Sequence, residues 1–268
     1  MFFSIGQVRD FVTKSRNWVT SVLIFIQTFV VLKSVNMRIL RILIVVTNIN
    51  IYESGKLRTG LWLGELTHIY HEAITNGYEV TIASPNGGNV PVDPESLKRF
   101  TLDKISRRYW EDSSFRKLLK NSKSLAKVSG QQFDCVYLAG GHGTMYDFPN
   151  NTTLQNIIRT HYETGKIVSA ICHGVGGLLN VKLSNGEYLI RDRTITGFNW
   201  FEESLAKRKK EVPFSLEAEL KKRTSNYKKA LIPMTSKVIV DGNIITGQNP
   251  FSSKEMAKVI IDELKNKR

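Results

Sequence analysis

The sequence predicts an α/β fold in which a mostly parallel β-sheet lies between layers of helices, and three observations support this. Short runs of β-branched and apolar residues alternate with longer amphipathic segments along most of the chain. The short runs are apolar on both faces, which is typical of strands buried in a parallel sheet. The turns between them are short, so right-handed crossovers are expected to bring ligand-binding residues to the carboxyl ends of the strands.

The first βαβ unit is predicted near the start of the folded part. Residues 38–48 form a continuous apolar run, which predicts the first sheet strand. Apolar residues at helical spacing predict a helix over 59–76, ended by Gly77 and followed by a strand over 78–84. The polar, basic segment 94–130 comes next and is predicted to form a small helical cap inserted into the domain.

The same alternation continues to the carboxyl end of the chain. The predicted elements are strands over 133–139, 166–171 and 194–197, helices over 153–164, 174–183, 202–222 and 252–265, and a hairpin over 238–246 that turns at Asp241 and Gly242. No internal repeat or low-complexity linker divides this part. Residues 37–268 are therefore expected to form one α/β domain.

Composition limits the classes of function. The chain has 268 residues, of which 41% are hydrophobic and 23% charged, as in ordinary globular proteins. The net charge of +14 would suit a nucleic-acid ligand, but the basic residues are scattered and no nucleic-acid-binding motif accompanies them, so no nucleic-acid partner is predicted. Two cysteines, Cys135 and Cys172, are too few for a disulfide framework, which favours a reducing, cytoplasmic location.

Residues 1–36 form a hydrophobic and basic extension whose role the sequence leaves open. An apolar run over 18–32 follows Lys14 and Arg16, but it is shorter than a membrane-spanning helix, and no convincing cleavage site follows it. An organelle-targeting peptide, a membrane anchor and a true start at Met37 are the alternatives. Membrane contact is expected only if the extension is retained as an anchor.

The strongest local motif is I-V-S-A-I-C-H-G at residues 167–174. A buried strand ends in Cys172, and the small residues Ala170 and Gly174 lie two positions to either side. Small residues at these positions permit the sharp strand-to-helix turn of a nucleophile elbow. Amide groups at the helix amino terminus favour a thiolate and can hold an oxyanion, so Cys172 is predicted to be a nucleophile and Cys135 a buried structural thiol.

A glycine-rich loop after a neighbouring strand is the second motif. The loop L-A-G-G-H-G covers residues 138–143, and its glycines let backbone amides approach a reacting oxygen. Gly141 is therefore a candidate oxyanion donor, while His142 is interpreted as an ordinary loop histidine. No histidine follows His173, so the chain cannot take its base from a carboxyl-terminal histidine as class I glutamine amidotransferases do.

Five motifs together resemble the ThiJ/PfpI superfamily, in particular its heat-shock chaperone and glyoxalase III branch. In the family's order they are G-E-L-T-H at 64–68, A-G-G-H-G at 139–143, A-I-C-H-G at 170–174, I-T-G-F at 195–198 and T-G-Q-N-P at 246–250. The chain departs from the family pattern at Ile69 and Val175, where proline is frequent. The resemblance implies a flavodoxin-like parallel-sheet sandwich of the class I glutamine amidotransferase-like type.

The resemblance also implies a catalytic set. Cys172 would be the nucleophile, with His173 beside it and Glu65 opposite the thiol. A hydrogen bond from Glu65 to the sulfur would lower the thiol pKa, or Glu65 would transfer protons. An acid that orients His173 is also implied, with Glu203 expected and Glu202 as the alternative.

The implied reaction is the conversion of methylglyoxal, a small 2-oxoaldehyde, to D-lactate by a lyase of the D-lactate dehydratase type in defence against glycation stress. Cys172 would add to the aldehyde as a hemithioacetal, with the amides of Gly141 and His173 holding the oxygen. No cofactor and no metal site are expected, and homodimer formation is left open. Two alternatives remain: a stress chaperone or protein deglycase of the same family, and a cysteine peptidase or other hydrolase.

Overall fold

The computed structural model describes residues 38–267. Within the described part of the chain, residues 40–267 form one compact unit. The predictions made for residues 1–36 lie outside the described residues. No helix in the described part of the chain has both the length and the apolar character needed to cross a membrane.

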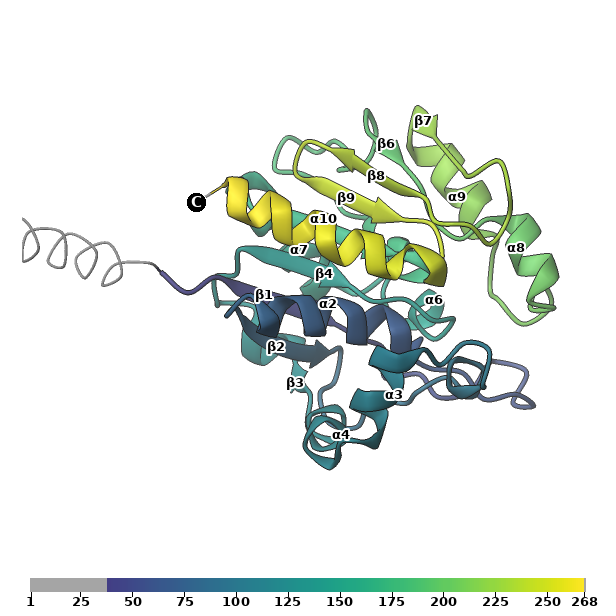
Figure 1. The fold of residues 1–268 in the computed structure, drawn as a ribbon. Helices are drawn as coiled ribbons and strands as arrows, with labels where there is room; N and C mark the ends of the chain where they lie inside the picture. Colours follow the sequence, from purple (N-terminus) through teal and green to yellow (C-terminus); the bar gives the residue numbers. More distant parts are fainter. Residues whose placement is uncertain (1–37, 268) are drawn as a thin grey trace, which may run out of the picture. The chain divides into compact units, whose positions relative to one another are not determined.

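Within residues 38–267, a seven-stranded sheet forms the centre of the fold (Figure 1). Its strands, in spatial order, are β3 (Lys123–Ser124), β2 (Glu79–Ser84), β1 (Arg41–Val45), β4 (Cys135–Leu138), β5 (Ile167–Ile171), β9 (Ile244–Gly247) and β8 (Val238–Asp241). All neighbours pair in parallel except β8 and β9, which form the predicted antiparallel hairpin. The predicted α/β class with a mostly parallel sheet is confirmed.

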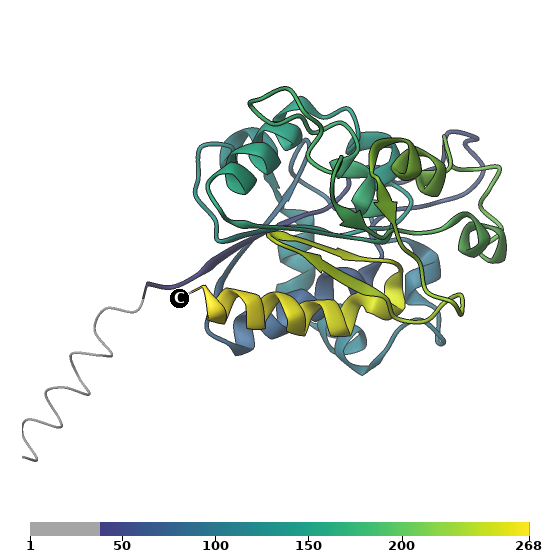
Figure 2. The same ribbon diagram turned by 90° about the horizontal axis from the view of Figure 1, so that it is seen from above.

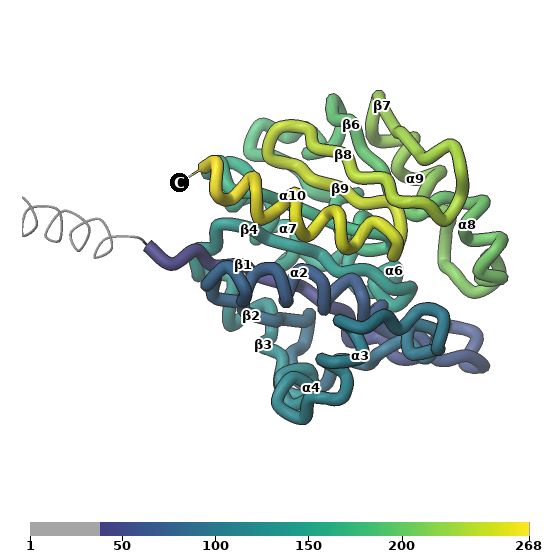
Figure 3. Tube along the Cα trace, viewed as in Figure 1, coloured from purple at the N-terminus to yellow at the C-terminus, as the bar shows by residue number. Residues whose placement is uncertain are grey.

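Helices cover both faces of this sheet. The helices α2 (Leu63–Thr75) and α10 (Ser253–Asn266) lie against one face, and α7 (Thr152–Glu163) lies against the other (Figure 2). Although α2 and α10 are far apart in the sequence, they run side by side (Figure 3). In α10 the buried residues recur at helical spacing and form one apolar stripe toward the sheet: Met256, Ala257, Ile260, Ile261 and Leu264.

Segment 94–130 contributes both to the sheet and to the helical layer. It contains η1 (Pro94–Leu97), α3 (Lys104–Glu111), α4 (Ser113–Lys120), β3 and α5 (Leu125–Val128). Helix α3 packs on α2, while β3 pairs with β2 at the edge of the sheet. The segment therefore stands beside the carboxyl end of β2, next to the start of α2.

The prediction of a helix over 174–183 is wrong. A 3₁₀-helix, η2 (Cys172–Leu178), follows β5 directly and ends earlier. Two of its glycines are required by close approach, because a Cβ atom on Gly174 would lie 2.6 Å from the carbonyl oxygen of Leu138 and one on Gly177 would lie 2.8 Å from the side chain of Leu138. A glycine-rich turn packed this tightly does not continue as a regular α-helix.

The prediction of one helical stretch over 202–222 is also wrong. Two helices, α8 (Trp200–Leu205) and α9 (Leu216–Arg223), replace it. Helix α8 ends at Leu205, and Lys207 just beyond it has a left-handed backbone with φ 58°, which is typical of a helix end. Pro213, before the start of α9, disfavours helical backbone in the residue before it.

The remaining elements are short. Strands β6 (Thr194–Ile195) and β7 (Asn226–Tyr227) form a separate two-stranded sheet. Helix α6 (Thr144–Asp147) follows β4, and the 3₁₀-helix η3 (Pro250–Ser252) follows β9. The loops after β4, β5 and β9 thus meet at one edge, as expected for a parallel sheet.

Candidate active site

Cys172 lies at the sharp turn after β5, where the sequence predicts a nucleophile elbow. Its backbone has φ 56°, a left-handed conformation that is uncommon for a residue other than glycine. Gly174 leaves the space that this turn needs, as its close approach to β4 shows. The elbow is confirmed, and strained backbone of this kind is typical of functional sites.

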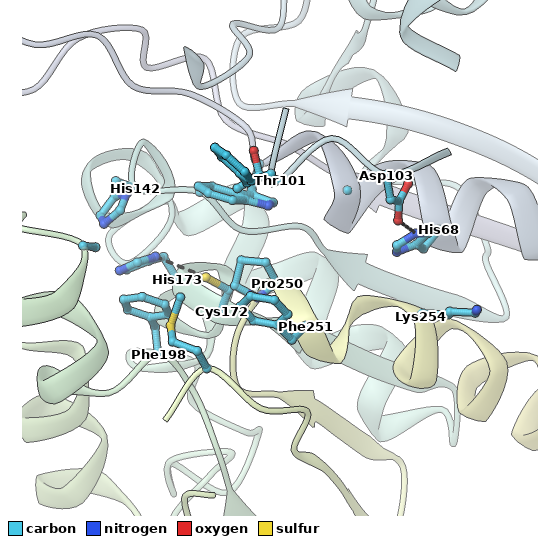
Figure 4. Close-up of a pocket in the computed structure, with 16 residues that line it drawn as sticks. His68, Thr101, Asp103, His142, Cys172, His173, Phe198, Pro250, Phe251 and Lys254 are labelled. Atoms are coloured by element: carbon cyan, nitrogen blue, oxygen red, sulfur yellow. Dashed lines mark hydrogen bonds and ion pairs between the residues drawn. The ribbon is translucent and has the colours of Figure 1, made fainter. Parts of the chain in front are cut away.

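Two hydrogen bonds connect Cys172 to an acid through His173. The Sγ atom of Cys172 lies 3.3 Å from Nδ1 of His173, and Nε2 of His173 lies 2.8 Å from Oε2 of Glu203 (Figure 4 shows the first contact). An ionised carboxylate only accepts hydrogen bonds, so Nε2 carries the hydrogen and the Nδ1 lone pair faces the thiol. His173 is therefore arranged to accept the thiol proton.

Glu203 also holds a second histidine. Nε2 of His142 lies 2.8 Å from Oε1 of Glu203, and the rings of His142 and His173 are 4.1 Å apart between centroids. Both histidines are buried. The interpretation of His142 as an ordinary loop histidine is thus corrected: β4 pairs with β5, so the loop after β4 ends beside the elbow.

The charges in this cluster favour an ionised acid between two histidines. Burial opposes ionisation of Glu203, but His173 and His142 outweigh it and lower the pKa of Glu203 well below its ordinary value. Burial, together with the nearby His173, lowers the pKa of His142. His142 is therefore neutral at pH 7 and donates its Nε2–H to the carboxylate.

The adjacent acid, Glu202, has a different environment. Its Oε1 accepts hydrogen bonds from the Met234 amide, Gln248 Nε2 and Asn249 Nδ2, each at 2.8 Å. Its Oε2 accepts from the Asn199 amide in a capping box at the start of α8. The structure thus places Glu203, and not Glu202, on His173.

Glu65 occupies the opposite side of the thiol, in the first turn of α2. Its side chain is fully buried, and its Oε2 accepts a hydrogen bond of 2.7 Å from the Gly140 amide. Burial raises the pKa of Glu65 to about 8, although hydrogen bonds with Cys172 and Gly140 act in the opposite direction. At neutral pH Glu65 therefore carries a proton.

The thiol of Cys172 is protonated in the resting protein. Burial is the largest cause, and the neighbouring Glu65 adds to it, so that the pKa of Cys172 lies well above its ordinary value. The expectation that the helix terminus favours a thiolate is therefore not met, because desolvation outweighs the short η2 terminus. The sulfur needs a base at the moment of attack, and His173 is in contact with it.

The two glycines of the loop after β4 have different roles. The Gly140 amide is occupied by Glu65, and a Cβ atom at Gly140 would lie 2.5 Å from Glu65 Oε2 and 2.9 Å from the Cys172 Cβ. Gly141 has φ 105°, and within residues 38–267 its amide has no protein acceptor. The Gly141 amide is therefore available to a substrate oxygen, whereas sequence reasoning missed Gly140.

A cavity of about 320 Å³ opens above Cys172. Figure 4 shows His142 and His173 on one side of Cys172, and His68, Asp103 and Lys254 on the other. His68 and Asp103 are paired with each other at 2.6 Å. Sequence reasoning did not identify the other walls of this cavity, which include Trp62, Phe100, Phe198, Met234, Pro250 and Phe251.

One group in the described part of the chain has the ligand types of a metal site. His142, His173 and Glu203 each offer one atom, all within 4.8 Å of one another. These atoms already form hydrogen bonds among themselves. The hydrogen bonds of Glu203 to the two imidazoles explain why these three side chains lie together. That the protein needs no metal remains an expectation from the sequence.

Comparison with known proteins gives a family match and relatives that are named glyoxalases. Residues 63–263 match the DJ-1/PfpI family. Glyoxalase 3 of Candida albicans is 30% identical over 230 residues, covering 82% of this chain and 97% of that protein. The glutathione-independent glyoxalase HSP31 of Saccharomyces cerevisiae is 31% identical over 238 residues, covering 84% and 98%.

Solved structures agree with these sequence matches. The Rapid Encystment Protein 24 kDa of Francisella tularensis superposes with a TM-score of 0.80 at 38% identity, covering 84% of this chain and 99% of that one. Glyoxalase III from Candida albicans superposes with a TM-score of 0.76 at 30% identity, covering 83% and 96%. The flavodoxin-like fold implied by the five motifs is thereby confirmed.

Proposed function

The chain belongs to the DJ-1/PfpI family, and from this and the site we propose that it is a glutathione-independent glyoxalase, a lyase of the D-lactate dehydratase type acting on methylglyoxal. One observation carries the proposal: the Cys172 thiol has a base, His173, on one side and the protonated acid Glu65 on the other. This arrangement supplies the proton transfers that the isomerisation of a 2-oxoaldehyde requires.

The first step is addition of the thiol to the aldehyde. Cys172 gives its proton to Nδ1 of His173 while the sulfur bonds to the aldehyde carbon, and the carboxylate of Glu203 stabilises the imidazolium. Glu65 gives its proton to the aldehyde oxygen, which the Gly141 amide holds. The product is a neutral hemithioacetal, and Glu65 is now a carboxylate.

The second step moves hydrogen between the two carbons. Glu65 takes the proton from the carbon that carries sulfur, and His173 protonates the ketone oxygen to give an enediol. Glu65 then returns its proton to the second carbon while His173 takes the hydroxyl proton of the first. The result is an S-lactoyl thioester, and no oxidant or reductant is consumed.

Hydrolysis completes the reaction. Glu65 takes a proton from the attacking water, the carbon–sulfur bond breaks, and His173 protonates the leaving sulfur of Cys172. Lactic acid then dissociates to lactate and a proton. The thiol, the neutral imidazole and the protonated Glu65 are restored, so methylglyoxal and water are the only reactants.

The direct test is D-lactate formation from methylglyoxal by the purified protein, without glutathione and with a metal chelator. We expect turnover to be abolished in Cys172→Ala and in Glu65→Gln. Cys135→Ala is the matched control, because this second buried thiol lies in β4 and burial raises its pKa to about 12. Absence of D-lactate from the unmodified protein would reject the proposal.

A second candidate, binding of unfolded clients, is supported by one surface observation. Leu231 and Ile232 are apolar, and they are 101% and 68% exposed. A chaperone role predicts that the Cys172→Ala protein still suppresses aggregation of a denatured client, whereas Leu231→Ser with Ile232→Ser does not. A deglycase would instead lose its activity with Cys172, and a cysteine peptidase would form an acyl-enzyme with peptide esters.

We propose that residues 37–268 work as one domain in the cytoplasm, with segment 94–130 as its cap. Thr101 and Asp103 of this segment line the cavity, which supports a role in shaping it. The sequence leaves homodimer formation open, and light scattering of the purified protein measures it directly.

A further inference from the structure

We propose that the preferred substrates are 2-oxoaldehydes that carry an aromatic or branched apolar group, in preference to methylglyoxal. This inference rests on the proposed function and names the substrate class of the same site. It derives from the size of the cavity above Cys172 and from the side chains that form its walls.

The cavity is large for methylglyoxal. Its volume is about 320 Å³, whereas an enclosed apolar cavity of roughly 150 Å³ already holds a benzene molecule. Methylglyoxal ends in a single methyl group beside its two carbonyls. Once its aldehyde carbon is bonded to Cys172, most of the cavity is left without a substrate atom, and a larger group can occupy that space.

The walls of this space are mainly apolar and come from separate parts of the chain. Trp62 precedes α2, and its indole packs over Gly64, where an added Cβ would be 3.9 Å from the ring. Phe198 precedes α8, and its ring centroid lies 4.4 Å from that of His173. Phe251 belongs to η3, and Met234 lies in the loop before β8.

These four side chains line the same cavity as Cys172, so the substituent of a 2-oxoaldehyde bonded to the sulfur is expected to meet them. The wall next to the reacting sulfur is thus apolar and aromatic, which favours transfer of a phenyl or branched alkyl group from water. His68 and Asp103 also line the cavity and bond to each other, and the ammonium group of Lys254 is the other charged group in its lining.

A 2-oxoaldehyde with an aromatic group reacts through the same bond changes as methylglyoxal. With phenylglyoxal, the Cys172 sulfur bonds to the aldehyde carbon, and the hydrogen of that carbon moves to the adjacent carbon to give an S-mandeloyl thioester. Water then breaks the carbon–sulfur bond, so phenylglyoxal and water give mandelate and a proton. No other reactant is needed.

The experiment compares kcat/KM for phenylglyoxal and methylglyoxal with the purified full chain. We expect kcat/KM to be at least about tenfold higher for phenylglyoxal, because its ring buries more apolar surface. Phe251→Ala is expected to lower the ratio of kcat/KM for phenylglyoxal to kcat/KM for methylglyoxal about threefold or more, mainly by lowering the value for phenylglyoxal. Phe201→Ala is the matched control, because Phe201 and Phe251 are both 56% exposed and only Phe251 lines the cavity.

Met234→Ala provides a second test of the same wall, and it keeps the inference testable if Phe251→Ala does not fold. A kcat/KM for methylglyoxal that equals or exceeds the kcat/KM for phenylglyoxal in the unmodified protein would overturn the inference while leaving the glyoxalase function intact. An unchanged ratio in both Phe251→Ala and Met234→Ala would overturn it as well. Failure to turn over either aldehyde would reject the proposed function itself, which is a distinguishable result.

Discussion

The rings of His142 and His173 stack with 4.1 Å between centroids, and the two Nε2 atoms bond to different oxygens of one carboxylate, that of Glu203. One negative charge thus lies between two imidazoles. Because burial, together with the nearby His173, keeps His142 neutral, the carboxylate charge remains available to the imidazolium that forms on His173 during thiol addition.

Removing the His142 donor is therefore expected to slow the chemical step. We expect His142→Leu to lower kcat for methylglyoxal about tenfold or more with little change in KM, because Glu203 loses one of two hydrogen bonds that fix its orientation. His142→Gln retains a side-chain N–H and should recover part of kcat. His71→Gln is the control, and full kcat in His142→Leu would show that Glu203 needs no second support.

Glu65 links activity to stability. Its pKa is about 8 in the folded protein, against an ordinary value of 4.5. The folded state keeps a proton that the unfolded state loses, so the free energy of unfolding falls as pH rises from about 5 to about 8. Glu65→Gln removes this dependence and should stabilise the protein at pH 7 by about 3 kcal/mol while abolishing turnover.

Urea unfolding of both proteins at several pH values measures this effect. The predicted result is a difference in unfolding free energy that grows between pH 5 and pH 8, roughly in proportion to pH. If the difference in unfolding free energy between Glu65→Gln and the unmodified protein is constant over this range, Glu65 is ionised in the folded protein, contrary to its buried position.

The same proton sets the alkaline limit of catalysis. Because the addition step uses protonated Glu65, kcat/KM for methylglyoxal should fall as pH rises above about 8. The measurement is the initial rate of D-lactate formation across this range, corrected for the reaction seen with Cys172→Ala. A value of kcat/KM that keeps rising through about pH 9 would exclude Glu65 as the acid of this step.

Gly140 is expected to tolerate no side chain. A Cβ atom there would lie 2.5 Å from Glu65 Oε2 and 2.7 Å from the Ile171 carbonyl oxygen, so Gly140→Ala must displace Glu65 from the thiol. We expect a loss in kcat/KM on the order of 100-fold. Gly130→Ala is the control because nothing lies within 4 Å of its added Cβ, and comparable losses in both variants would contradict this account.

The sequence predicted those features that depend on neighbouring residues. The elbow at Cys172 follows from a buried strand next to small residues, and the parallel sheet follows from runs that are apolar on both faces. His142 was misread because its role depends on Glu203, which is 61 positions away in the chain. The state of the Cys172 thiol was also misjudged, because its burial depends on the assembled fold.

The adjacent residues Glu202 and Glu203 provide a last test, because the structure gives them separate tasks. Glu203 bonds to His173, whereas Oε1 of Glu202 accepts three hydrogen bonds that join α8 to the segments containing Met234 and Gln248. Glu203→Gln should lower kcat at least about 100-fold, since one amide cannot accept from both histidines.

Glu202→Gln should instead destabilise the fold by about 2 kcal/mol, because its new N–H group faces donors. Its kcat at 20 °C, well below the unfolding transition, should stay within about threefold of the unmodified value. Thermal unfolding and kcat measured on the same samples separate the two effects. A large loss of kcat in Glu202→Gln, with Glu203→Gln still active, would reverse the assignment, and the acid acting on His173 would then be Glu202.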